Sequence, residues 1–296
     1  MTVRLTMTPG TSGWADGDLR WIAGYHKGLW QDFTSEAEAA LTGKWLADQG
    51  WTVTIRPMGE AVEEPPSILL SGIVGSVAYG LDTEASDVDR LGVFAAPTKQ
   101  LVGLHPPKPS IVSTAPDATF HEAGKYAALA LKVNPTVTEL MWLPDDLYET
   151  RTPLGDALVR LRHNFLSRKA VRNAYLGYAT QQFRRLENRG DGSFSADTRK
   201  RTAKHARHLY RLCTQAIILW QTGRLTVRLP HGDAVLCRKF GNDVAGGDLD
   251  AGRRVIEWAE HIVSTSPTPL PEQPDERAVE KWLQEVRRAH YERTAA

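Results

Sequence analysis

Residues 68–94 read ILLSGIVGSVAYGLDTEASDVDRLGVF, and this stretch decides the fold. Its first part, residues 68–74, is an apolar and partly β-branched run that is too short to span a membrane. The run stops at Gly75 and Ser76, and an apolar run bounded by such a turn signal is typical of a buried strand. A second apolar run follows at residues 91–94. The stretch therefore predicts two strands connected through a glycine turn.

Two aspartates, Asp87 and Asp89, come after ten residues that separate them from the Gly-Ser pair. Side chains alternate across a strand, so both carboxylates are predicted on one face and Val88 on the other. Neighbouring carboxylates repel each other unless a cation compensates them. Mg²⁺, or Mn²⁺ in its place, suits such oxygen ligands and is commonly held by one or two carboxylates together with substrate phosphates.

The glycine turn beside these acids favours a phosphate. Gly75 has no Cβ and lets backbone N–H groups approach a ligand closely, and the Ser76 hydroxyl is a further donor. The alternative is an ordinary β-turn next to a solvated strand edge. Turn, spacing and paired acids together favour a divalent metal site beside a phosphate-binding turn.

The order Gly-Ser, ten residues, Asp-apolar-Asp resembles the signature of the DNA polymerase β-like nucleotidyltransferase superfamily. Further motifs are similar to the RNA-ligase-associated (RlaP-like) nucleotidyltransferases, namely GSVAYGL at 75–81, SDVD at 86–89, HEAGKY at 121–126 and NPTVTELMW at 134–142. The resemblance implies an α+β fold, in which a small mixed-sheet catalytic domain precedes an α-helical domain. It also implies that the protein transfers a nucleoside monophosphate from an NTP to a hydroxyl acceptor and releases pyrophosphate.

A third carboxylate completes the metal site in this superfamily. Residues 117–122 alternate as a strand and provide two candidates. Asp117 has the better position, whereas Glu122 stands at the start of the next predicted helix. We therefore predict Asp87, Asp89 and Asp117 as catalytic and metal-binding residues, and Glu122 stays open as the alternative third ligand.

A predicted helix at residues 198–222 carries a row of basic side chains. Their spacings of 3, 4 and 3 place them on one side of the helix, and the row consists of Arg201, Lys204, His208 and Arg211. Like charges this close repel each other unless anions lie opposite. Related nucleotidyltransferases hold the nucleotide with basic residues of a helical domain. The resemblance thus implies Lys204, Arg211 and His208 as nucleotide-binding residues, and a solvated basic face is the alternative.

The formal net charge of +1 conceals a segregation of charge along the chain. Residues 151–229 carry 17 Lys and Arg but 4 Asp and Glu, whereas residues 1–150 carry 10 and 19. A basic segment attracts polyanions, so we expect RNA or tRNA to bind there and an RNA end to be the acceptor. The basic helices could instead neutralise acidic faces within the fold, and a protein hydroxyl or a small molecule remains open as acceptor.

Two other functions compete with nucleotidyl transfer. One is a non-catalytic module of the same fold that binds nucleotides or nucleic acid. The other is a metal-independent ribonuclease, because Arg201 and His208 form the Arg-X6-His spacing found in HEPN-type enzymes. An enzyme should bind NTP far more tightly with Mg²⁺ than with a chelator, whereas a binding module should respond chiefly to salt.

The sequence predicts three segments: an N-terminal Trp-rich extension (1–64), the catalytic domain (65–146), and a basic α-helical domain (147–296) with a β-hairpin near 225–239. The tryptophans of the first segment are predicted to be core residues, and they are Trp14, Trp21, Trp30, Trp45 and Trp51. No apolar run reaches 18 residues and no secretory leader is apparent. We therefore expect a cytoplasmic protein with no membrane segment.

Overall fold

The chain forms two compact units, residues 1–64 and residues 65–296. A computed structural model describes the following residues: 3–8, 29–33, 35–57, 67–83, 86–114, 117–187 and 196–291. The predictions for Trp14 and Trp21 lie outside these ranges. Each unit has a sheet of its own.

The first unit is a three-stranded antiparallel sheet with one helix. Its elements are β1 (Val3–Thr8), β2 (Leu29–Phe33), α1 (Glu36–Asp48) and β3 (Thr52–Pro57), and the strand order is β2-β1-β3. Leu5 and Leu46 form its buried core, against which Trp51 packs. The prediction of core tryptophans is wrong for Trp45, whose side chain is 50% exposed on α1.

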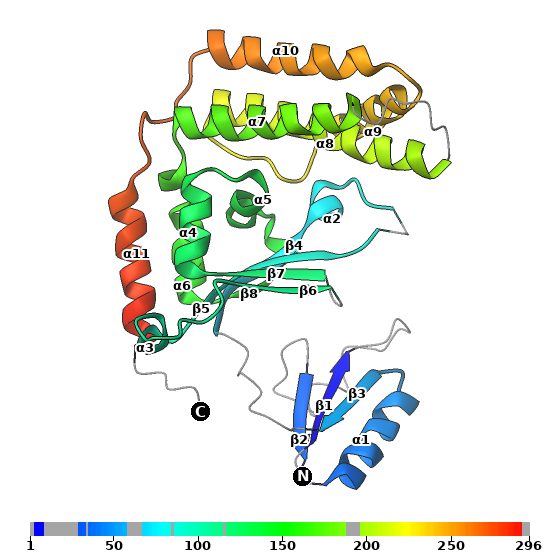
Figure 1. Ribbon diagram of the computed structural model, residues 1–296, viewed down its shortest axis with the longest axis vertical. Coiled ribbons are helices and arrows are strands. Elements are labelled where there is room, and N and C mark those ends of the chain that lie inside the picture. Colours follow the sequence, from blue (N-terminus) through cyan, green and yellow to red (C-terminus); the bar gives the residue numbers. More distant parts are fainter. Residues whose placement is uncertain are drawn as a thin grey trace. The chain divides into compact units, whose positions relative to one another are not determined.

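The second unit contains a mixed five-stranded sheet (Figure 1). Its strands are β4 (Ser67–Val74), β5 (Asp89–Ala95), β6 (Ser110–Thr114), β7 (Asp117–Glu122) and β8 (Tyr148–Arg151). The strand order is β6-β7-β5-β4-β8, in which β5 and β7 run parallel and the other neighbours are antiparallel. The apolar run in β4 is largely buried, as expected for a strand with neighbours on both sides.

A short helix, α2 (Gly75–Tyr79), follows β4 directly. The remaining helices lie on or beyond the sheet. They are α3 (Thr98–Leu101), α4 (Ala123–Leu131), α5 (Pro135–Thr138), η2 (Glu139–Trp142), η3 (Asp145–Leu147), α6 (Pro153–Arg160), η4 (Arg162–Phe165), α7 (Arg168–Glu187), α8 (Ala196–Thr222), α9 (His231–Ala245), α10 (Leu249–Thr265) and α11 (Glu276–Ala289).

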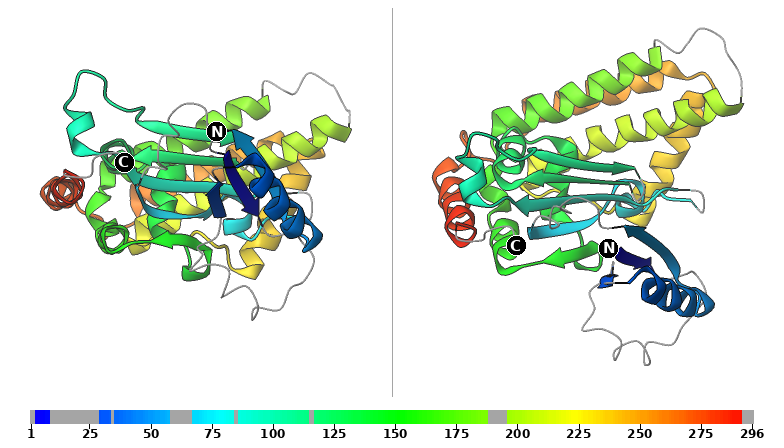
Figure 2. Two further views of the ribbon diagram at one scale, coloured as in Figure 1. Left: turned by 90° about the horizontal axis from the view of Figure 1, so that it is seen from below. Right: turned by 60° about the horizontal axis from the view of Figure 1, so that its bottom comes forward.

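These helices pack as two groups that share one core with the sheet. Helices α4, α6 and η2 contact the strands, and α11 lies alongside α4 and α6. The long helices α7 and α8 run side by side, and α10 packs on both of them (Figures 1 and 2). A single hydrophobic cluster extends from β4 through α7 and α8 to α11. The α+β fold class is therefore confirmed.

The predicted β-hairpin near 225–239 is wrong, because residues 231–245 form helix α9. Pro230 precedes the first helical residue, and the buried residues follow at helical spacings: Ala234, Cys237, Gly241 and Val244. The sequence PHGD resembles a turn but starts this helix instead. Beyond the predicted domain limit at residue 146, β8 still belongs to the five-stranded sheet and pairs with β4.

In the ranges that the structure describes, no helix combines the length and the apolar character needed to cross a bilayer.

Candidate active site

The register of the sheet brings Asp89 to the glycine turn. Asp89 is the first residue of β5 and pairs with Val74, the last residue of β4. Gly75 follows with a φ of 69°, and a Cβ on it would lie 2.1 Å from Oδ2 of Asp89. A glycine is needed here twice, because the backbone is left-handed and the carboxylate occupies the place of a side chain.

Asp117 enters the same site from the neighbouring strand. Strands β5 and β7 are parallel, and Arg90 pairs with Ala118, so Asp89 and Asp117 stand side by side one residue earlier. Burial raises the pKa of the Asp89 carboxyl, and the Asp117 carboxylate raises it further. A rise in pKa of this origin indicates that the two carboxylates are close enough for their negative charges to repel each other.

Asp87 lies just outside the sheet. The strand begins at Asp89, so the prediction that both aspartates alternate on one strand is wrong for Asp87, which is exposed in the preceding connection. Its carboxylate still contributes to the raised pKa of Asp89, after burial, Asp117 and the opposing effect of Lys204. The three predicted aspartates thus gather around the start of β5.

Lys204 is the basic residue of α8 that acts on this acidic group. Its side chain is exposed, and its ammonium group lowers the pKa of Asp89 against the effects of burial and of Asp117. Of the residues predicted to bind the nucleotide from α8, Lys204 therefore lies near the carboxylates.

Glu122, the alternative third carboxylate, lies at the other end of β7. It is buried and accepts hydrogen bonds from both terminal nitrogens of Arg287 on α11. It also caps α4 by accepting from the backbone N–H of Gly124 at 2.8 Å. Glu122 therefore joins α11 to the sheet and is separate from the aspartate group.

Arg211 does not lie on an exposed basic face, which corrects its predicted role. Its side chain is 1% exposed and forms an ion pair with the fully buried Glu139. The anion opposite this cation is thus a carboxylate of the protein. Arg211 is consequently not placed to contact a triphosphate.

His208 is likewise neither exposed nor charged. Burial, followed by the Arg211 guanidinium, lowers the pKa of His208 to about 3. Its Nδ1 therefore accepts the hydrogen bond from Nη2 of Arg211 at 3.0 Å. This neutral, engaged imidazole corrects the prediction of His208 as a nucleotide ligand, and it does not favour an Arg201–His208 ribonuclease site.

Tyr79 and Glu139 are parts of the site region that the sequence analysis did not find. The hydroxyl of Tyr79 donates to Oε2 of Glu139 at 2.7 Å, although the two residues are 60 positions apart. No spacing rule in the sequence connects Glu139 with Arg211, 72 residues further on. Only the folded chain brings them together.

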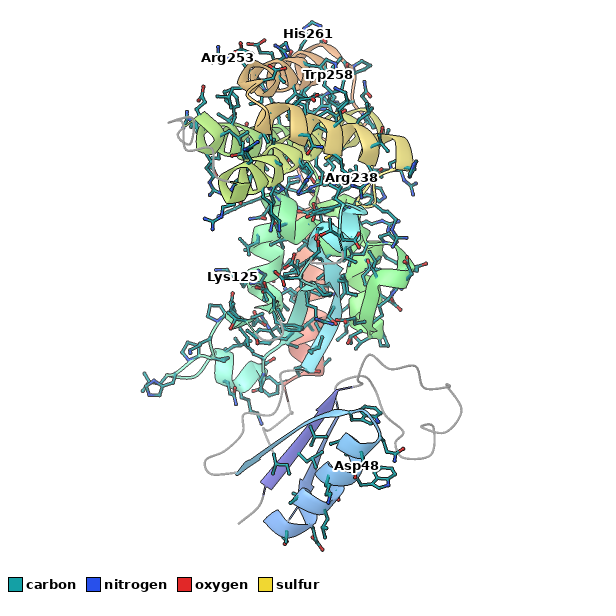
Figure 3. All side chains as sticks on the ribbon, turned by 90° about the vertical axis from the view of Figure 1, so that its right-hand side faces the viewer. Asp48, Lys125, Arg238, Arg253, Trp258 and His261 are labelled. Atoms are coloured by element: carbon teal, nitrogen blue, oxygen red, sulfur yellow. The ribbon has the colours of Figure 1, made fainter. Side chains whose placement is uncertain are left out.

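The C-terminal end of α2 is tied to the helical part of the unit. Arg238, which extends from α9 in Figure 3, donates to the carbonyl of Gly80 at 2.7 Å. The backbone N–H of Leu229 donates to the carbonyl of Tyr79 at 3.2 Å. The short helix therefore has the aspartates at its start and the helical region at its end.

The donors at the aspartate group suit a divalent cation that arrives with a nucleotide. Within the described ranges, no three or more His, Cys, Asp and Glu side chains form a ready metal cluster. Asp87 and Asp117 are exposed beside Asp89, whose raised pKa reports their negative charge. Because Mg²⁺ commonly takes one or two carboxylates and completes its shell with phosphates and water, the residues present fit it.

A basic hollow of about 400 Å³ lies at α8 and α9. Arg199, Lys200 and Arg207 supply its positive charge, and Asn242 lines it from α9. The two helices approach closely there, since a Cβ on Gly241 would lie 2.6 Å from Cγ of Arg207. Helix α8 thus carries one exposed cation, Lys204, that acts on Asp89, and a second basic group at this hollow.

A mixed sheet that places a Gly-Ser turn against strand-borne aspartates, followed by helices, defines a nucleotidyltransferase fold of the polymerase β type. The chain belongs to the RlaP family, described as RNA repair pathway DNA polymerase beta family, and the match covers residues 56–231. This is more than half of the chain and includes Gly75, the three aspartates and Lys204. A search of curated proteins finds no match. The predicted resemblance is confirmed.

Proposed function

We propose that this protein transfers a nucleoside monophosphate from an NTP to a hydroxyl acceptor. The acceptor oxygen forms a bond to the α-phosphorus, the bond from that phosphorus to the pyrophosphate oxygen breaks, and the acceptor proton is lost to solvent. The observation that carries the proposal is the contact of the Asp89 carboxylate with Gly75, with Asp117 beside it. Membership of a polymerase β-type family supports the same reaction.

Each residue of the group has a separate task in this proposal. Asp87, Asp89 and Asp117 would hold Mg²⁺ or Mn²⁺, which when bound neutralises phosphate charge and lowers the pKa of the acceptor hydroxyl. The Gly75 backbone and the Ser76 hydroxyl would contact the β- and γ-phosphates. The Lys204 ammonium would offset the charge of the triphosphate.

The acceptor in this proposal is an RNA end. The basic hollow with Arg199, Lys200 and Arg207 lies on the helix that also carries Lys204. A strand whose phosphates contact the hollow could therefore present its terminal hydroxyl near the aspartates. Cations that contact phosphates release counterions, so RNA binding should weaken steeply as salt increases.

The test is transfer of label from each of the four [α-³²P]NTPs to RNA oligonucleotides that end in a 3′-hydroxyl or a 3′-phosphate. Reactions contain Mg²⁺, Mn²⁺ or a chelator. We expect one or more labelled residues to be added to the 3′-hydroxyl RNA with metal present, and none with chelator. Asp89→Asn and Asp117→Asn should abolish transfer, and Asp250→Ala, an exposed change on α10, should leave it intact.

Absence of label with all four NTPs, or label that survives Asp89→Asn, would overturn the proposal. Label on the protein or on small molecules but not on RNA would retain nucleotidyl transfer and reject RNA as the acceptor. Tight NTP binding that ignores metal, without transfer, would identify a non-catalytic binding module. Cleavage of the RNA in chelator would instead indicate a ribonuclease.

A further inference from the structure

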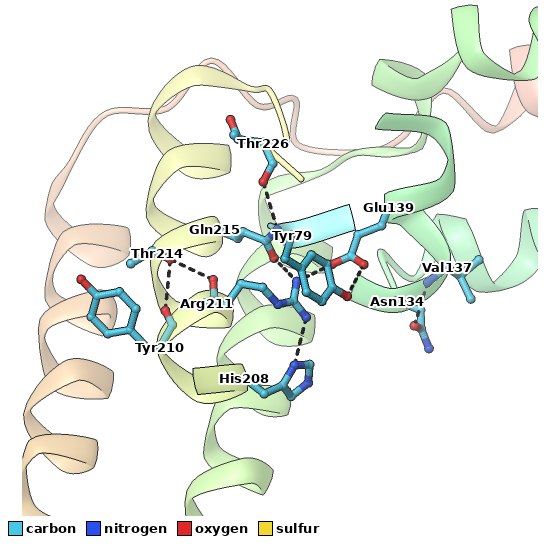
Figure 4. Close-up of polar contacts among 10 residues, drawn as sticks. All are labelled: Tyr79, Asn134, Val137, Glu139, His208, Tyr210, Arg211, Thr214, Gln215 and Thr226. Carbon is cyan, nitrogen blue, oxygen red and sulfur yellow. Dashed lines mark hydrogen bonds and ion pairs between the residues drawn. The ribbon is translucent and has the colours of Figure 1, made fainter. Parts of the chain in front are cut away.

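A buried polar network lies between α2 and α8 (Figure 4). Its centre is the ion pair of Arg211 and Glu139, whose side chains are 1% and 0% exposed. The Tyr79 hydroxyl donates to the second oxygen of Glu139, and the Arg211 guanidinium stacks 3.7 Å from the centre of the Tyr79 ring. Both sides of the carboxylate and one face of the guanidinium are thereby occupied.

The network continues along α8 through both terminal nitrogens of the Arg211 guanidinium, whereas its buried Nε has no hydrogen-bond partner among the described residues. Nη1 of Arg211 also donates to Oε1 of Gln215 at 2.6 Å, and Nη2 donates to Nδ1 of His208. Gln215 in turn donates to the carbonyl of Thr226 at 3.0 Å. Arg211 is therefore held by residues before and after it on its own helix, as well as by Glu139.

The members of the network stand at defined places relative to the aspartate group. Tyr79 is the last residue of α2, and Gly75, which contacts Asp89, is the first. Lys204 lies seven residues before Arg211 on α8, which is two helical turns along the same side. The network thus joins α2, which begins at the glycine turn of Gly75 and Ser76 (the phosphate turn of the proposed reaction), to α8, which carries Lys204.

The proposed reaction needs these two helices at a fixed spacing. In the proposed reaction, the turn at Gly75 and the ammonium of Lys204 contact one triphosphate from two sides. Gly75 lies against the Asp89 carboxylate, and Lys204 lies two turns from Arg211 on α8. Lys204 is exposed and has a long flexible side chain, so its position depends on how α8 is anchored. The buried pair at Arg211 is an anchor within two turns of it.

We propose that Tyr79, Glu139 and Arg211 are positioning residues that hold α2 against α8, so that the phosphate turn and Lys204 face the same triphosphate. The network would act on NTP binding through Lys204 and would not contact the nucleotide. This inference rests on the proposed function for its ligand, an NTP, and on the geometry alone for the joining of the two helices.

The first arm of the experiment measures amide hydrogen exchange without any ligand. Tyr79→Phe removes one hydroxyl and keeps the ring, and Arg211→Lys keeps the charge and loses the planar guanidinium. We expect both variants to exchange faster in peptides covering residues 75–80 and residues 200–211. Unchanged exchange in both peptides would overturn the inference, whether or not the protein proves to bind NTP.

The matched control is Arg287→Lys, which alters a second, partly buried Arg–Glu pair, with Glu122. It should speed exchange in α11 and at the start of α4 but leave residues 75–80 as in the unaltered protein. If Arg287→Lys loosens residues 75–80 as much as Arg211→Lys does, the effect is general destabilisation and the positioning role is rejected.

The second arm is a double-mutant cycle on binding of each of the four NTPs with Mg²⁺. Loss of a hydrogen bond to a charged group predicts that Tyr79→Phe weakens NTP binding by about tenfold. In a Lys204→Met background the same change should add less than about twofold, because the residue being positioned is gone. For any transfer observed, KM for the NTP should rise while kcat changes little.

Fully multiplicative effects of Tyr79→Phe and Lys204→Met would show that the network does not act through Lys204. An unchanged affinity in Lys204→Met would reject the inference in the same way. If the unaltered protein binds none of the four NTPs, the proposed function fails, and the exchange measurements still decide whether the network joins α2 to α8.

Discussion

Gly75 combines a φ of 69° with an aspartate oxygen 2.1 Å from where a Cβ would be. Gly80, at the other end of the same short helix, has a φ of 70° but no atom within 4 Å of its Cβ position. The two glycines therefore share the backbone requirement and differ in the close approach. Alanine at Gly80 would therefore add backbone strain alone, whereas alanine at Gly75 would add the same strain and also displace the Asp89 carboxylate.

Gly75→Ala is expected to reduce nucleotidyl transfer by about a hundredfold or more, because a shift of the reacting group by about 1 Å has such an effect. Gly80→Ala should lower the free energy of unfolding by about 1–2 kcal/mol, the cost of a left-handed residue, and keep most of the transfer activity. Label transfer and urea unfolding measure the two effects. Equal losses of activity in both variants would contradict the role of the Asp89 contact.

Asp89 should make the fold less stable when it is ionised. Its raised pKa means that the folded chain binds this proton more tightly than the unfolded chain, whose carboxyl has a pKa of about 3.9. The stability contributed by the protonated Asp89 carboxyl is therefore lost as the pH rises through the pKa that this carboxyl has in the folded chain. We expect Asp89→Asn to raise the thermal unfolding midpoint at pH 7 and to lose this advantage near pH 4.

The thermal unfolding midpoint in the presence of Mg²⁺ is a second test of the same site. Binding to the folded state alone stabilises it, so Mg²⁺ with NTP should raise the midpoint of the unaltered protein and not that of Asp89→Asn. A stabilisation by Asp89→Asn that persists unchanged from pH 7 to pH 4 would contradict the origin of the pKa shift in ionised neighbours and burial.

At the scale of elements, the local patterns and the structure agree where one segment contains its own signal. Strand β7 spans Asp117–Glu122, as the alternation predicted, and α8 spans Ala196–Thr222 against a predicted 198–222. The alternation failed at Asp87 because pairing of β5 with β4 begins only at Asp89. The prediction of a hairpin near 225–239 was wrong because the sequence PHGD at 230–233 is compatible both with a turn and with the start of a helix.

Removing only one charge of the buried ion pair between Arg211 on α8 and Glu139 on η2 should destabilise the fold strongly. Arg211→Met leaves Glu139 buried without its counter-ion and should lower the free energy of unfolding by about 3–5 kcal/mol. The double variant Arg211→Met/Glu139→Met should recover most of this loss, because two apolar side chains replace both charges. Urea unfolding measures the cycle.

The control for this cycle is Arg228→Met, which breaks the solvent-exposed pair with Asp146. It should leave the unfolding midpoint nearly unchanged, since water screens both charges. A loss from Arg228→Met as large as that from Arg211→Met would show that burial is not what makes the Arg211–Glu139 pair important.

For the whole molecule, the division into residues 1–64 and 65–296 has a direct consequence. The second unit has its own sheet, a continuous hydrophobic core and all residues of the candidate site. We expect residues 65–296 alone to unfold in one cooperative thermal transition and to retain label transfer. An inactive or unfolded 65–296 fragment beside an active full chain would show that the first unit is required.

The sequence by itself determined the parts of this protein that depend on neighbours along the chain: β4, the Gly75 turn, the aspartates, β7 and the long helices. Their signals are spacings within about a dozen residues, which backbone geometry converts directly into shared faces. Only the tertiary structure decided which cations of α8 are exposed. Lys204 and Arg211 have equivalent positions in the helical pattern, but Arg211 is buried in an ion pair with Glu139, which lies 72 residues earlier in the chain. That choice depends on packing between distant segments, and no local pattern contains it.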